Sequence, residues 1–224
     1  MFNSGFWSEW LRYFNGIIMP AIWSTMRMLA ASMIFAFIIG FALAILLIIW
    51  GPRGLNPNKR GYVLMDFIIN AIRSFPIIIL IVAISPITRM VVGTSIGEKA
   101  AIFPLTISAA PFMARIIENS LLAVDYQLIE AARSFGLSNM QIIFKVMIKE
   151  AIPSIIAGTT LSTITFLTAT TLAGAVGAGG IGAVALNYGY QSFNNSVLYT
   201  SVFILLIMVQ VIQMLGNFMY KKSI

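Results

Sequence analysis

The chain of 224 residues is too apolar and too sparsely charged for a soluble globular domain. Apolar residues make up 59% of it and charged residues 9%, against about 45–50% and about 25% in soluble domains. Its 14 basic and 7 acidic residues cannot cover a globule, so lipid must surround most of the surface. The net charge of +7 lies in short clusters between long apolar runs, which excludes a nucleic-acid interface.

Cysteine and histidine are both absent from the sequence. Thiolate chemistry is therefore excluded, together with the commonest proton relay and metal ligand. We expect no metal site and no cofactor. The sequence also holds no catalytic constellation and no P-loop, so the chain is not expected to be an enzyme.

The first membrane span is predicted at 23–50, between Trp23 and Trp50, which would stand about 40 Å apart along a helix. Arg12 and three of its neighbours precede this span, and the apolar run is too long for a signal core of about 7–15 residues. The N-terminal segment is therefore expected to stay in the protein; those neighbours are Trp7, Glu9 and Trp10.

Four further spans are predicted at 63–85, 100–117, 151–176 and 197–219, with a charged segment at 118–150. With the N-terminus outside, nine basic residues fall on the inner side and only three on the outer side. The inner group is Arg53, Lys59, Arg60, Arg115, Arg133, Lys145, Lys149, Lys221 and Lys222, and the outer group is Arg12, Arg89 and Lys99. The sequence therefore predicts an all-α membrane protein with about five transmembrane helices, a single transmembrane domain at 1–224, an N-terminus outside and a cytoplasmic C-terminus.

Residues 125–150 are predicted to form two short cytoplasmic helices joined at a corner. Asp125 has the chemistry of an N-cap, and Gly136 follows the last periodic residue, where a left-handed position favours glycine. Apolar residues of the first helix are expected on one face, namely Leu128, Ile129, Ala132 and Phe135.

The second of these helices begins with a capping box formed by Ser138 and Gln141. Its expected apolar stripe is Met140, Ile143, Phe144, Met147 and Ile148. Two interpretations remain: an amphipathic hairpin on the bilayer surface, or a rigid element that docks into the groove of a soluble partner.

Glu130-Ala131-Ala132, followed after three residues by Gly136, resembles the EAA motif of ATP-binding-cassette importer permeases. That resemblance implies a type I importer fold in which the short helix fits a cleft on a separate ATPase and transmits its closure. It assigns ATPase coupling to Leu128, Glu130, Ala131, Ala132, Phe135 and Gly136. The family pattern continues with an aliphatic residue, any residue, an aliphatic residue and proline; here the proline position holds Lys149, and a proline follows only at Pro153.

Further segments are similar to the methionine-importer branch of that family: 73–76, 84–88, 93–97, 174–182 and 188–190. The resemblance implies methionine as substrate and a place in the bacterial cell membrane. It also implies two copies of an ATPase and an extracellular methionine-binding lipoprotein as partners. Five spans are too few to enclose a path, so a homodimer is expected.

The predicted fourth span is rich in hydroxyl side chains, with eight Ser or Thr among residues 159–171. They either bond back to helix carbonyls or line a path between two copies. Thr163, Thr170 and Leu172 are the candidates for the path or its gate. The string Gly177-x-Gly179-x-x-Gly182 matches a dinucleotide fingerprint, but no strand is expected before it, so that function is excluded.

Asp66 and Arg73 are the opposite charges expected deep within one span, where a charge is costly. Either they make a structural contact between helices or they serve transport. The alternative function is an ion- or proton-coupled carrier or small channel, but no histidine and no acid are expected near the middle of a span.

Overall fold

A computed structural model describes residues 11–52 and 54–224, and every regular element in these stretches is helical. Trp7, Glu9, Trp10 and Arg53, on which parts of the topology prediction rest, lie outside the described residues. Four helical stretches are long and apolar enough to cross a membrane, and a broken helix pair raises that number to five. The all-α prediction with about five spans is confirmed.

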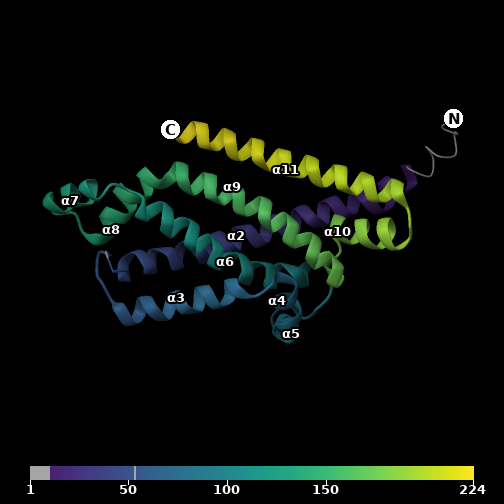
Figure 1. Cartoon of the computed structure of the whole chain (residues 1–224), viewed down its shortest axis with the longest axis horizontal. Coiled ribbons are helices and arrows are strands. Elements are labelled where there is room, and N and C mark those ends of the chain that lie inside the picture. Colours follow the sequence, from purple (N-terminus) through teal and green to yellow (C-terminus); the bar gives the residue numbers. More distant parts are fainter. Residues whose placement is uncertain (1–10, 53) are drawn as a thin grey trace. The chain divides into compact units, whose positions relative to one another are not determined.

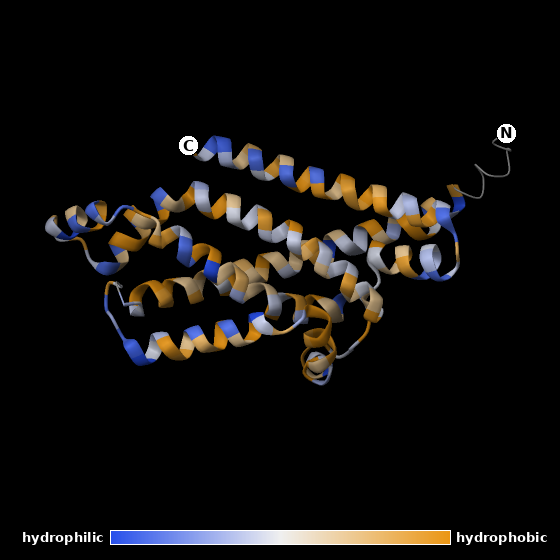
Figure 2. Cartoon of the chain, viewed as in Figure 1, coloured by the Kyte–Doolittle hydropathy of each residue, from blue (hydrophilic) through white to orange (hydrophobic). Residues whose placement is uncertain are grey.

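The continuous helices follow the predicted spans to within a few residues (Figure 1). A π-helical turn, η1 (Phe14–Ile18), leads into α2 (Met19–Trp50). The other long helices are α6 (Glu98–Leu122), α9 (Ile148–Ala173) and α11 (Asn195–Ser223). Figure 2 shows hydrophobic residues along α2, whereas hydrophilic residues gather at the start of α3 (Lys59–Ser74) and in α7 (Tyr126–Ser134).

The span predicted at 63–85 corresponds to a broken pair of helices, Lys59–Ser74 and Ile77–Ala83, bent by 101°. Helix α3 ends at Ser74, and the next two residues, Phe75 and Pro76, both have ψ of 131° and leave the helical conformation. Proline has no N–H to donate and disfavours helical angles at the residue before it, which explains the break. Helices α4 (Ile77–Ala83) and α5 (Ser85–Val92) follow. Helix α5 therefore lies between the predicted second and third spans.

The chain groups into two compact units, and the single permease domain at 1–224 stays a prediction. The first unit comprises Met1–Ile34, Pro76–Thr106 and Thr163–Ile212. One of its apolar cores joins the start of α2 to the hairpin that precedes α11. The buried members of this core are Ile18, Ala21, Ile181, Val184 and Val197.

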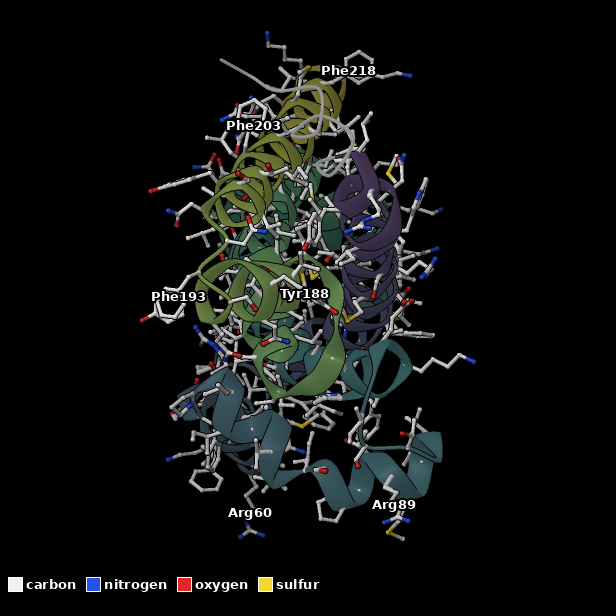
Figure 3. All side chains as sticks on the ribbon, turned by 90° about the vertical axis from the view of Figure 1, so that its right-hand side faces the viewer. Arg60, Arg89, Tyr188, Phe193, Phe203 and Phe218 are labelled. Atoms are coloured by element: carbon white, nitrogen blue, oxygen red, sulfur yellow. The ribbon has the colours of Figure 1, made fainter. Side chains whose placement is uncertain are left out.

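The hairpin of the first unit consists of η3 (Gly174–Ala178), α10 (Gly180–Ala183) and η4 (Val184–Gln191). The backbone N–H of Ile181 donates to Oγ1 of Thr25 at 2.8 Å, and that hydroxyl donates to the carbonyl of Ala21 at 3.0 Å. Gly180 has φ +78°, and a Cβ there would stand 2.6 Å from Oγ1 of Thr25. The glycine-rich segment 174–182 is thus a folded element that is hydrogen-bonded to α2. Phe193 points outward from the turn after η4 (Figure 3).

The second unit comprises Phe35–Phe75, Ile107–Ser162 and Gln213–Ile224. Its main core joins α2, α6, α7, α8 (Asn139–Ile142) and the π-helical turn η2 (Ile143–Met147) to the start of α9. Buried members from the cytoplasmic segment include Ile129, Ala132, Ile142, Ile143 and Met147. The segment predicted at 118–150 is therefore packed into the same core as the ends of the membrane helices.

Candidate functional site

The candidate site is the pair of short helices α7 and α8, called here the helical knob (residues 125–142). In Figure 1 the two helices lie side by side beyond the end of α6 and are joined at a sharp corner. Helix α7 begins as predicted, because a carboxylate oxygen of Asp125 accepts the backbone N–H of Gln127 at 2.9 Å. This bond satisfies one of the free donors of the first turn and fixes where the helix starts.

Helix α7 ends in a Schellman motif centred on Gly136. The N–H of Gly136 donates to the carbonyl of Arg133 at 2.8 Å, and the N–H of Leu137 donates to that of Ala132 at 3.2 Å. Gly136 has φ +76°, so the predicted left-handed position is confirmed. An added Cβ would meet nothing within 4 Å, which means that glycine is required here by its backbone angles and not by space.

The predicted capping box at the start of α8 is also present. The N–H of Ser138 donates to Oε1 of Gln141 at 2.9 Å, and the N–H of Gln141 donates to Oγ of Ser138 at 3.4 Å. Asn139 donates from Nδ2 to the carbonyl of Leu55 at 3.2 Å, which ties the corner to the turn between α2 and α3. The corner is therefore held on one side by the backbone bonds of the Schellman motif and on the other by a side-chain capping box, as a rigid element requires.

The burial of α7 differs from the single apolar face that the sequence predicts. Ile129 and Ala132 are buried, whereas Leu128 is 44% exposed and Phe135 is 84% exposed. Phe135 is the C-cap residue, so it lies past the last helical residue and does not follow the helical period. Its ring is exposed to solvent, and so is the side chain of Glu130 in α7. The knob thus has an inner face in the core and an outer face that is partly apolar.

Of the six residues that the family motif suggests, the structure places five at the surface of the knob and one inside it. Ala132 is 7% exposed, which makes it a packing residue. The five exposed ones are Leu128, Glu130, Ala131, Phe135 and Gly136. An exposed aromatic ring among polar side chains is typical of a surface that binds another protein.

The apolar stripe predicted for the second helix is shifted. Ile142, Ile143 and Met147 are buried, but Met140 and Phe144 are about half exposed, at 55% and 50%. A π turn, η2, follows Ile142 and adds a residue to the helix; the exposure of Met140 precedes this turn and has no explanation in it. Sequence periodicity assumes a regular helix and cannot place such a turn.

A buried charge cluster, missed by the sequence analysis, joins α6 to α3 beside the knob. Arg115 donates from Nη1 to Oε2 of Glu118 at 2.7 Å and from Nη2 to Asp66. Asn70 donates from Nδ2 to Oδ2 of Asp66 at 3.0 Å. The side chain of Glu118 is 4% exposed and that of Arg115 is 15% exposed. The sequence did contain one signal for this cluster: Arg115 and Glu118 are three residues apart, a spacing that allows an ion pair on one face of a helix.

Asp66 and Arg73 do not form the pair that their spacing in one span suggests. Asp66 makes the contact between helices, with Arg115 as its partner. The Arg73 guanidinium lies 4.9 Å from the ring centroid of Phe112, on α6. The two intramembrane charges therefore have different surroundings, and only that of Asp66 contains an opposite charge within ion-pair distance among the described residues.

The three candidate path residues on α9 do not share a face. Thr170 is buried and donates to the carbonyl of Leu167 at 2.7 Å, whereas Leu172 is 41% exposed. Thr163 is seven residues before Thr170 and lies on the same side of the helix as Thr170, opposite Leu172. The exposed threonines on the face of Leu172 are Thr165 and Thr168.

Comparison with protein families gives a match over residues 48–223 to the model described as binding-protein-dependent transport system inner membrane component. Among curated proteins, the chain is 37% identical over 215 residues to the probable D-methionine transport system permease protein MetI of Vibrio cholerae, with 96% of each chain covered. It is 42% identical over 151 residues to the D-methionine transport system permease protein MetI of Escherichia coli K12, covering 67% of this chain and 70% of that one.

Solved structures give the same result for the fold. The chain matches a chain of the MetNI methionine ABC transporter in inward-facing conformations, CY5 native crystal form, with a TM-score of 0.92 and 40% identity. That match covers 94% of this chain and 98% of the other. An amino acid ABC transporter crystallised with histidines matches with a TM-score of 0.77 and 19% identity, over 95% and 96% of the two chains, which supports the fold alone.

Proposed function

This chain belongs to the family of inner membrane components of binding-protein-dependent transport systems, and from that premise we propose that it is the permease subunit of an ATP-driven methionine importer. Two copies form the translocation path, and each copy docks one ATPase subunit through its helical knob. A binding protein delivers methionine at the outer face. The chain itself hydrolyses no ATP.

The proposed coupling role is supported by the way in which the knob is fixed to the rest of the protein. Capping bonds fix both of its helices, and its inner residues Ile129 and Ala132 belong to the core that holds the ends of the membrane helices. A force applied to the exposed residues Glu130 and Phe135 is therefore transmitted to the membrane helices, because close-packed cores move as units. Closure of an ATPase pair would move two such knobs together and switch access between the two sides of the membrane.

The proposed substrate and partners follow from the printed names of relatives that cover most of this chain. The permeases of Vibrio cholerae and Escherichia coli are named for D-methionine transport, and the structural relative is named as a methionine ABC transporter. The homodimer is supported by the helix number, since up to five spans per copy leave a path to be enclosed by symmetric pairing. The bacterial inner membrane is the proposed location.

The docking test uses two matched phenylalanines of nearly equal exposure. Phe135→Asp places a charge on the knob, where the side chain is 84% exposed, and Phe193→Asp does so on the hairpin, where it is 89% exposed. We expect Phe135→Asp to remove the ATPase from the complex during purification in detergent, and Phe193→Asp to leave ATPase binding unchanged. Equal recovery of ATPase with both variants would contradict docking through the knob.

A further inference from the structure

Arg73 is a charged residue deep in the membrane-spanning part of the chain. It occupies the last turn of α3, which begins at Lys59. Fourteen residues of helix separate the two, a rise of about 21 Å, whereas the hydrocarbon core of a bilayer is about 30 Å thick. The side chain of Arg73 is exposed in the single chain. A charge at this depth must face water or a partner, because facing lipid is too costly.

Helix α3 places Arg73 on the same face as Asp66 and Asn70, with spacings of three and four residues. The part of this polar face nearer the start of α3 is neutralised within the protein. Asp66 pairs with Arg115, and Nη2 of Arg115 donates to Oδ1 of Asn70 at 3.3 Å. Arg73, about one turn further along α3, contacts the ring of Phe112. That contact orients the guanidinium but supplies no negative charge.

The carboxylates of this chain cannot supply the missing charge. Of the seven acidic residues, Glu98 pairs with Arg27, and Asp66 and Glu118 pair with Arg115. The remaining four lie outside the predicted spans: Glu9, which is outside the described residues, and Asp125, Glu130 and Glu150. A second copy of the chain brings the same set and leaves Arg73 equally without a carboxylate at its depth.

We propose that Arg73 binds the carboxylate of the amino-acid substrate as it passes through the membrane. A guanidinium forms two parallel, charge-assisted hydrogen bonds with a carboxylate, and Phe112 offers an apolar surface next to them for the substrate side chain. The inference rests on the proposed function, because it requires that an amino acid crosses the membrane along this face of α3. The permease itself would then recognise the carboxylate group that all amino acids have in common.

The test measures methionine uptake and ATP hydrolysis together in vesicles that contain the permease, the ATPase and the binding protein. Arg73→Met is expected to lower the methionine carried per ATP by about 10- to 100-fold, the ratio that corresponds to one charge-assisted interaction, while the complex still assembles and hydrolyses ATP. Arg73→Lys should keep part of the uptake, because it retains the charge. The matched control is Arg60→Met, an arginine that points away from the first turn of the same helix (Figure 3).

Wild-type vesicles that take up no methionine would refute the proposed function, and the inference on Arg73 would fall with it. With active wild type, unchanged methionine per ATP in Arg73→Met would overturn the inference. A parallel fall of uptake, hydrolysis and thermal midpoint would also overturn it, in favour of a structural role. The uptake defect is expected to persist in vesicles made only of zwitterionic lipid. A defect confined to anionic lipid would identify a lipid headgroup as the partner of Arg73 and contradict the proposal.

Discussion

Gly136 offers a direct test of whether the geometry of the knob matters for ATPase binding. Its φ of +76° is a left-handed angle, and an added Cβ would meet nothing within 4 Å. Gly136→Ala therefore changes only the conformational energy, by about 1–2 kcal/mol. That energy corresponds to a factor of about 5–30 in the population of the correct corner. Gly136→Asn adds a larger side chain in the same open space but tolerates the left-handed angle better.

The assay is the affinity of the purified permease for its ATPase in lipid nanodiscs, measured with both variants. We expect Gly136→Ala to bind the ATPase about 5–30-fold more weakly than wild type and Gly136→Asn to bind with a clearly smaller loss. Methionine uptake should follow the same order. If alanine and asparagine weaken binding equally, the backbone angle is not the cause, and the reasoning from the Schellman motif is refuted.

Two further predictions concern contacts that hold each unit together. Thr25→Val removes the acceptor for the N–H of Ile181, which costs about 1–3 kcal/mol; hydrogen exchange at Ile181 should accelerate, and Thr25→Ser should restore its protection. Arg115→Met leaves the carboxylates of Asp66 and Glu118 without their cation, a loss of about 3–5 kcal/mol, so the thermal midpoint should fall. An unchanged midpoint would show that the cluster contributes no stability.

The sequence was most informative where a structure depends on neighbours along the chain. Asp125 caps the residues that follow it, Gly136 closes the helix before it, and Ser138 pairs with Gln141 three residues later. Each of these features is set by local hydrogen bonds and backbone angles. Apolar runs of sufficient length likewise locate membrane helices, because a bilayer has a fixed thickness.

Other features depend on what lies across the fold, and there the sequence was insufficient. The partner of Asp66 is Arg115, 49 residues away, and the nearer Arg73 in the same helix has a different environment. In the second helix of the knob, Ile142 is buried and Phe144, which lies in the π turn η2, is half exposed, which differs from the apolar stripe that the sequence predicts. Pro76 did signal the break of the second span. Apolar residues continue on both sides of it, so hydropathy alone predicts one uninterrupted apolar segment.

The candidate path residues show the same limit. Composition identified α9 as rich in hydroxyls, but not which of them are exposed. Thr170 bonds to its own helix, whereas Thr165 and Thr168 share the exposed face of Leu172. The assignment of Thr163, Thr170 and Leu172 to the path or its gate stays a prediction.

The most direct test of the proposed function is methionine uptake by vesicles that contain the permease with its neighbouring ATPase and binding protein. The account predicts accumulation of methionine against its gradient that requires ATP and both partners, and that is lost with Phe135→Asp. Methionine movement by the chain alone, driven by its own gradient or by a proton gradient without the ATPase, would contradict the account and identify a carrier or channel instead.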